Sequence, residues 1–148
     1  MIVEDSKFKP DRYAVACHII CDGKILYVKR KKNKPQGGKW GCIGGKVENG
    51  EDNLTAIKRE VQEETGLTLE KENFKYIRTW NTVFKKKEKN CDYLSFTYSL
   101  YQVKFENKPD IVIPKDELDE YDWFTPEEAL KQDLFQDEDN VLKEIYNL

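Results

Sequence analysis

The chain has 148 residues and a net charge of −3 at pH 7, which fits one domain with a single substantial core. Charged residues of both signs are plentiful, so we expect a soluble protein with no dedicated nucleic-acid or membrane surface. No apolar run approaches the roughly 20 residues of a membrane span, and the N-terminus lacks a signal-peptide core, so the expected location is cytoplasmic.

The first half of the chain predicts a β-hairpin followed by a glycine-rich turn. Residues 13–20 alternate in the manner of a strand, Asp22-Gly23 supplies a turn, and residues 25–29 continue as the second strand. A basic loop over 29–39 follows. Residues 41–47 then predict a short strand that bends through two glycines toward a helix.

The next segment predicts an amphipathic helix. It should begin near Glu51 or Asp52, where acidic residues suit the positive end of the helix dipole. Gly66-Leu67 is typical of a left-handed C-cap with its apolar contact. An apolar stripe at three- and four-residue spacing marks the face that packs on the core: Leu54, Ile57 and Val61.

Strands dominate the second half of the chain. Residues 74–84 and 93–105 predict two strands joined by a charged loop, 109–114 another short extended piece, and 122–124 one more strand. The run Thr125-Pro126-Glu127-Glu128 predicts a capped helix toward Lys131, and a C-terminal helix is expected over 140–146. Strands, helix, strands, helix is the order of an α/β protein with a mixed sheet.

The cysteines and the single histidine do not predict a metal or disulfide framework. No CxxC pair is present, so a zinc or disulfide site is disfavoured and the chain is expected to be reduced. Cys17 and Cys21 should be small buried or half-buried thiols in a strand. His18, also in that strand, is expected to be a structural or surface imidazole rather than a general base.

Three carboxylates of the predicted helix share one side. Glu60 is three residues from Glu63 and four from Glu64, so like charges crowd together. A bound divalent cation would compensate, with Arg59 supplying positive charge nearby. Mg²⁺ prefers carboxylate oxygen and is commonly shared with substrate phosphates. A solvated acidic face is the plainer alternative.

The spacing of this segment resembles the Nudix box of the Nudix hydrolases. Gly45 is followed after five residues by Glu51 and after seven more by Arg59-Glu60-Val61-Gln62-Glu63-Glu64-Thr65-Gly66-Leu67. The glycine-rich run 44–48 and Trp40 upstream also resemble the family, whereas Ile43 stands where many members have proline. The resemblance implies a single Nudix domain over 1–148, folded as an α/β/α sandwich with a mixed β-sheet.

The resemblance also implies roles for the matching residues. Glu60, Glu63 and Glu64 look like metal ligands, or carboxylates bonded to metal-bound water, and the Gly44 carbonyl is a further expected ligand. Arg59 would orient the carboxylates. The motif residues expected to be structural are Gly45, Glu51 and Gly66, with Glu51 ordering the loop and helix by hydrogen bonds.

A separate catalytic base is expected from the acidic stretch before Trp123, which the resemblance places at the start of the last strand. Glu117 and Glu120 both qualify, with Glu117 slightly favoured by its distance from Trp123. The alternative is that this acidic loop is simply solvated.

Substrate contacts are harder to assign. Lys46 is a candidate for phosphate contact, and the lysine runs at 29–34 and 85–89 either steer an anionic substrate or are solvated loops. Aromatic residues could stack on a base, or more simply pack in the core: Trp40, Trp80, Phe84 and Tyr93. Trp40 and Phe84 are the two chosen as substrate contacts.

The predicted function is a Mg²⁺-dependent pyrophosphohydrolase, with Mn²⁺ also possible, that cleaves a nucleoside triphosphate to the monophosphate and pyrophosphate. Alternatives are a hydrolase of nucleotide sugars, dinucleoside polyphosphates or 5′-phosphorylated RNA, and a non-catalytic nucleotide sensor. The sensor is disfavoured because all three box carboxylates are present. Nucleic-acid and membrane partners are not expected, and a homodimer is possible.

Overall fold

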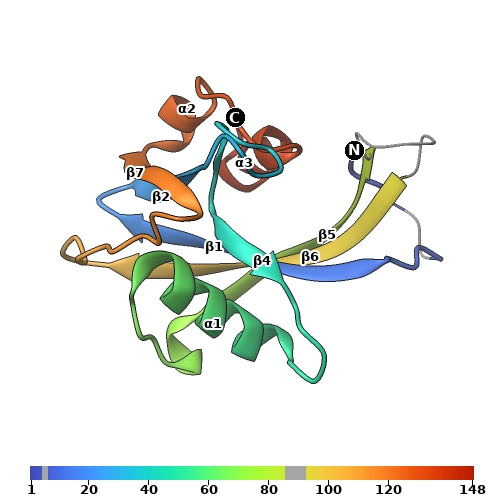
Figure 1. The fold of residues 1–148 in the computed structure, drawn as a ribbon, viewed down its shortest axis with the longest axis horizontal. Coiled ribbons are helices and arrows are strands. Elements are labelled where there is room, and N and C mark those ends of the chain that lie inside the picture. Colours follow the sequence, from blue (N-terminus) through green and yellow to red (C-terminus); the bar gives the residue numbers. More distant parts are fainter. Residues whose placement is uncertain (5–6, 86–92) are drawn as a thin grey trace.

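The computed structural model describes residues 1–4, 7–85 and 93–148, with the side chains of residues 84, 85 and 93 left out. One mixed sheet forms the centre of the fold and helices lie on both sides of it (Figure 1). The strands are β1 (Arg12–Cys21), β2 (Lys24–Arg30), β3 (Trp40–Gly41), β4 (Ile43–Lys46), β5 (Lys75–Lys85), β6 (Tyr93–Phe105) and β7 (Leu118–Phe124). The helices are α1 (Asn53–Thr65), the 3₁₀ turn η1 (Lys71–Asn73), α2 (Pro126–Ala129) and α3 (Glu138–Tyr146).

Strand β1 organises the sheet because it contacts three other strands. One edge pairs in parallel with β6 over its whole length. The other edge pairs antiparallel with β4 over residues 14–17 and with β2 only at residues 20 and 21. Strands β2 and β4 therefore separate from one another after leaving β1. Strand β2 pairs onward with β3 and β7, and β6 pairs with β5.

The alternation of side chains along β1 assigns the two faces of the sheet. Val15, Cys17 and Ile19 pack in the cluster that contains the buried stripe of α1. Ala16 and Ile20 pack in the opposite cluster, which contains Leu142 of α3. The predicted α/β/α sandwich is therefore confirmed, with α1 on one face and α3 on the other (Figure 1).

The ends of the predicted elements have the expected local chemistry. Asp22 and Gly23 both take positive φ, at 52° and 70°, which closes the hairpin between β1 and β2. The side chain of Asp52 accepts from the Thr55 amide at 2.8 Å and so caps α1, whose first helical residue is Asn53. Gly66 ends α1 at φ 77°. Thr125 caps α2, although that helix stops at Ala129.

Two predictions near the C-terminal half need correction. The acidic stretch before Trp123 is not one loop, because β7 begins at Leu118 and Trp123 is close to its end. The strand extends further because its antiparallel pairing with β2 continues to Arg30, with a bulge at Lys29/Arg30. Residues 109–114 form no strand, although the Val112 amide bonds to the Thr65 carbonyl at 2.9 Å.

Cys17 and Cys21 are buried as expected, and the three described cysteines are free thiols. His18 is also buried, which excludes the surface alternative for its imidazole. Apart from the backbone of Lys85, the lysine run at 85–89 lies outside the described residues. Among the described residues, no helix is long and apolar enough to cross a membrane.

Candidate active site

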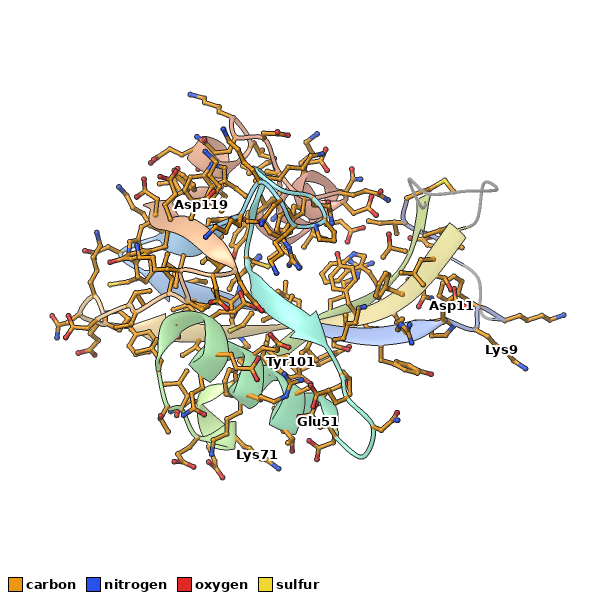
Figure 2. The ribbon with its side chains drawn as sticks, in the orientation of Figure 1. Lys9, Asp11, Glu51, Lys71, Tyr101 and Asp119 are labelled. Carbon is orange, nitrogen blue, oxygen red and sulfur yellow. The ribbon has the colours of Figure 1, made fainter. Side chains whose placement is uncertain are left out.

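Arg59 connects the loop after β4 to the acidic side of α1. Its Nε and Nη2 donate to the two carboxylate oxygens of Glu51 at 2.8 and 2.9 Å, a bidentate pair. Nη2 also donates to the Lys46 carbonyl at 2.9 Å. Glu51, which precedes α1 (Figure 2), accepts in turn from the Glu48 amide. Arg59 and Glu51 therefore fix the loop against the helix.

The same guanidinium contacts the carboxylates of the helix. Nη1 of Arg59 donates to Glu60 Oε1 at 2.9 Å and reaches Glu63 at 3.3–3.4 Å. The Glu60 side chain is 13% exposed and the Glu63 side chain 57%. Glu60 is therefore held firmly at the base of the site, whereas Glu63 lies at its rim.

Glycines 44 and 45 bring β4 close to both the sheet and the helix. A Cβ on Gly44 would lie 2.3 Å from the Val15 carbonyl oxygen of β1. A Cβ on Gly45 would lie 2.3 Å from the Glu60 carboxylate. Only glycine allows both approaches, so the acidic face of α1 packs directly against the backbone of β4.

The register of β4 leaves the Gly44 backbone free to face the site. The Val47 amide bonds to the Tyr13 carbonyl, and hydrogen-bonded pairs alternate along an antiparallel ladder. Gly44, opposite Ala16, therefore belongs to a non-hydrogen-bonded pair, and its amide and carbonyl point away from β1. A hydrogen bond from the Gly44 backbone acts on Glu64.

Glu60 and Glu64 crowd each other on the inner side of α1. Burial raises the pKa of Glu64 well above its usual range, and the charge of Glu60 raises it further. Burial also raises the pKa of Glu60, although Arg59 opposes this. The negative charges of two half-buried carboxylates in contact are poorly compensated without an added cation.

Arg30, at the end of β2, is a site residue that the sequence did not reveal. Its positive charge lowers the pKa of Glu64, against the stronger effect of burial. Its Nε is buried with no hydrogen-bond partner in the described structure. Side chains alternate along β2, so Arg30 shares the α1 face with Leu26 and Val28. An unpartnered donor beside the carboxylates is suited to an anionic group.

The donor set of this site fits a hard divalent cation. Its ligands would be the carboxylates of Glu60, Glu63 and Glu64, with the outward Gly44 carbonyl, and oxygen ligands are what Mg²⁺ and Mn²⁺ prefer. Arg59 pairs with Glu60 and reaches Glu63, whereas Glu64 is buried against Glu60 and its pKa is raised, so a cation at this point would offset the crowded negative charge.

Comparison with known proteins identifies the family. A family model described as the NUDIX domain matches residues 10–145. The chain belongs to the Nudix family. A CTP pyrophosphohydrolase of Escherichia coli (strain K12) is 45% identical to it over 53 residues, which make up 36% of this chain and 39% of that enzyme. The similarity to that relative therefore spans well under half of its length.

Solved Nudix structures share the fold. The MutT Nudix hydrolase of Burkholderia pseudomallei is 26% identical, with a TM-score of 0.65 over 90% of this chain and 97% of that one. The Escherichia coli dihydroneopterin triphosphate pyrophosphohydrolase has a TM-score of 0.73 over 96% of this chain and 100% of that one. At 19% identity, this second likeness concerns the fold alone.

The residues predicted to contact substrate differ in burial and in the side chains around them. Lys46 has an exposed side chain beside the glycine pair. Trp40 is buried, and its ring packs edge-on against Phe124 in the core on the α3 face. Core packing was the alternative to base stacking in the sequence analysis. Trp80 is also buried and donates to Glu144. The Phe84 side chain lies outside the described part of the chain.

The two candidate bases differ in their positions relative to β7. Glu120 pairs with Lys29, whose ammonium lies over the Trp40 ring, and the two charges are 3.8 Å apart. Glu120 therefore faces the α3 side. Glu117 precedes Leu118, the partner of Arg30, and its carbonyl accepts from the Lys31 amide. Its side chain is exposed and belongs to the turn that precedes β7.

Proposed function

We propose that this Nudix protein is a Mg²⁺-dependent pyrophosphohydrolase, with Mn²⁺ an alternative ion, that cleaves a nucleoside triphosphate to the monophosphate and pyrophosphate in the cytoplasm. The observation that carries the proposal is that Glu60 packs against Gly45 and Glu64 is hydrogen-bonded to the Gly44 backbone. Arg59 joins Glu60 to Glu63 on the same side of α1. The similarity to a CTP pyrophosphohydrolase supports a triphosphate substrate.

The box residues would hold the ion between the helix and β4. Glu60 and Glu64 form the inner part of this set, and Glu63 completes it from the exposed rim. When bound, Mg²⁺ neutralises phosphate oxygens and makes water a better nucleophile. Arg59 keeps the carboxylates oriented because its own position is fixed by Glu51.

Positive side chains around the carboxylates suit a polyphosphate. Arg30 presents an unpartnered Nε on the α1 face, and Lys46 adds a flexible ammonium beside the glycines. Hydrogen bonds to ionised phosphate are stronger than neutral ones, so both residues should bind the triphosphate chain rather than the nucleoside. We propose that they hold it across the ion.

Glu117 is the proposed general base. It lies next to the strand position opposite Arg30, whereas Glu120 lies on the other face of the sheet and pairs with Lys29. A base must come within hydrogen-bond reach of the attacking water, directly or through one water. A residue on the α3 side of β7 is poorly placed for water held at α1.

The test is release of pyrophosphate or phosphate from a panel of nucleoside triphosphates, nucleotide sugars and dinucleoside polyphosphates with Mg²⁺. We expect one triphosphate to be turned over fastest, Glu63→Gln to lower kcat by a hundredfold or more, and the exposed Glu72→Gln control to leave it unchanged. Product analysis should show the monophosphate and pyrophosphate. Tight nucleotide binding without turnover would instead support a sensor module.

A second comparison separates the two candidate bases. Glu117→Gln should lower kcat by about 10²–10⁴-fold, the usual contribution of general base catalysis, and flatten the pH–rate profile. Glu120→Gln removes only an exposed ion pair and should leave kcat within about twofold. The opposite ranking would assign the base to Glu120.

A further inference from the structure

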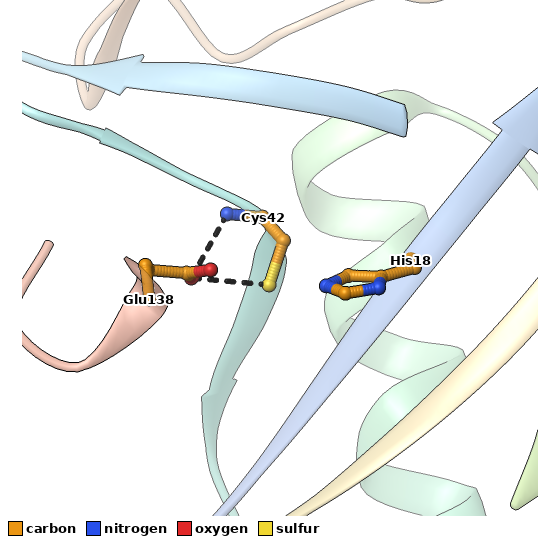
Figure 3. Close-up of side chains that lie close together, drawn as sticks. All are labelled: His18, Cys42 and Glu138. Carbon is orange, nitrogen blue, oxygen red and sulfur yellow. Dashed lines mark hydrogen bonds between the residues drawn. The ribbon is translucent and has the colours of Figure 1, made fainter. Parts of the chain in front are cut away.

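A second group of potential metal ligands lies on the α3 face of the sheet. It consists of His18 from β1, Cys42 between β3 and β4, and Glu138 at the start of α3. One ligand atom from each lies within 4.8 Å of the others. Figure 3 shows the imidazole, the sulfur and the carboxylate pointing toward one another.

The contacts of Glu138 show that this cluster is preorganised. Its Oε1 accepts from both the amide and the thiol of Cys42, each at 3.2 Å. Bond lengths of about 2.0–2.3 Å around a tetrahedral Zn²⁺ place ligand atoms about 3.3–3.6 Å apart. The sulfur–oxygen pair already has nearly this separation, and the imidazole nitrogen lies within 4.8 Å of both atoms.

The imidazole of His18 has an open coordination position. Its Nδ1 lies 2.9 Å from the Tyr146 hydroxyl, which also accepts from Gln102 at 3.3 Å. Its Nε2 is buried and has no hydrogen-bond partner in the described residues, and His18 is 0% exposed. A ligating histidine characteristically donates its second ring nitrogen to a neighbour in this way.

The surroundings give a second indication of a missing partner. Three buried side-chain nitrogen or oxygen atoms lack a hydrogen-bond partner in the described part of the chain: His18 Nε2, Tyr27 Oη and Arg30 Nε. The first of these atoms, His18 Nε2, belongs to this cluster. Burial raises the pKa of Tyr27, and the charges of Glu138 and Cys42 raise it further. Leaving a buried polar atom without a partner is unfavourable, and a bound ion would supply the partner that His18 Nε2 lacks.

We propose that His18, Cys42 and Glu138 form a site for Zn²⁺ that is separate from the carboxylate site on α1. Binding transfers the Cys42 thiol proton to solvent, and the resulting thiolate and carboxylate balance the charge of the ion within the fold. Imidazole and thiolate ligands select Zn²⁺ over Mg²⁺. Three protein ligands leave a fourth position for water. Of the three, Glu138 is the partly exposed residue.

Co²⁺ titration of the purified, chelator-stripped full chain tests the proposal. A thiolate-to-Co²⁺ charge-transfer band requires a sulfur ligand, so the oxygen ligands of α1 cannot produce it. We expect the band to saturate at one equivalent, to disappear on Zn²⁺ addition and to be unaffected by excess Mg²⁺. Absence of the band in the wild-type protein at saturating Co²⁺ would overturn the proposal without any variant.

Variants then locate the site. Cys42→Ser should abolish the band, whereas the matched control Cys17→Ser changes a buried cysteine on the other face and should keep it. Tyr146→Phe removes the hydroxyl that contacts His18 and Gln102 but no proposed ligand, and it should weaken Co²⁺ binding by about tenfold or more. Persistence of the band in Cys42→Ser would assign the sulfur ligand elsewhere and refute the site.

Discussion

The same substitution at the two adjacent glycines of β4 should mainly lower stability at Gly44 and mainly lower turnover at Gly45. In Gly44→Ala the new Cβ would lie 2.3 Å from the Val15 carbonyl oxygen and 3.0 Å from the Ala16 Cα. Both are backbone atoms of the central strand, so β4 must move away from β1. Overpacking of this kind costs about 3 kcal/mol, which is about 9 °C in Tm for a chain of this size.

In Gly45→Ala the new Cβ meets the end of the Glu60 side chain, again at 2.3 Å. The carboxylate can rotate away, so the loss of stability should stay below about 1.5 kcal/mol. Rotation removes Glu60 from Arg59 Nη1 and from the proposed ion site, so Mg²⁺-dependent turnover should fall at least tenfold.

Thermal unfolding without metal and steady-state turnover with Mg²⁺ measure the two effects. Gly50→Ala is the control for glycine replacement, because its Cβ would meet nothing within 4 Å and only the positive φ is disfavoured. Equal losses of Tm in Gly44→Ala and Gly45→Ala, or wild-type turnover in Gly45→Ala, would refute this account of the glycine pair.

Three further predictions concern single residues. Because burial raises the pKa of Glu64, metal-free wild-type protein should lose stability relative to Glu64→Gln as the pH rises above about 4.5, the ordinary value for this carboxyl. Melting curves in chelator across pH would test this, and a difference that does not vary with pH would contradict it. Gly66→Ala should cost about 1 kcal/mol, or about 3 °C in Tm, because the C-cap holds φ at 77°; calorimetry should show no change in metal affinity. Leu142→Ala, at a fully buried position, should cost about 3 kcal/mol in urea unfolding, whereas Val112→Ala, at a 71% exposed one, should stay within about 0.5 kcal/mol.

Local features of the fold could be predicted from the sequence because their causes lie within a few residues. The Asp22-Gly23 turn, the capping of α1 by Asp52 and the Gly66 C-cap depend on neighbouring backbone conformation alone. The spacing of Glu60, Glu63 and Glu64 likewise follows from helix geometry. These elements were predicted with their ends correct to within one or two residues.

Features set by pairing between distant segments were not predicted. The extent of β7 depends on its register with β2, which local composition does not encode. Arg30 is one basic residue in a lysine-rich stretch, and only the sheet places it on the α1 face beside Glu64. The alternation of the strand could have indicated this position, because Arg30 is two residues after Val28 and four after Leu26 and so faces the same side of the sheet.

The cluster on the α3 face was missed for the same reason. Cys42 and Glu138 are 96 positions apart, so no CxxC-like spacing marks them as neighbours. The sequence argument against zinc assumed ligands close together in the chain. The fold instead brings single ligands from β1, the β3–β4 connection and α3 to one point.

The parallel pairing of β1 with β6 has a consequence for how the protein folds. Segments about 84 positions apart must meet before the centre of the sheet exists, as the contact between Asp11 and Ser95 illustrates. The β1–β2 and β5–β6 hairpins close short loops and can form early, but joining them carries the entropy of a much longer loop. Folding should therefore be limited by this docking step, and destabilising changes at the β1–β6 seam should slow refolding more than equal changes in α3.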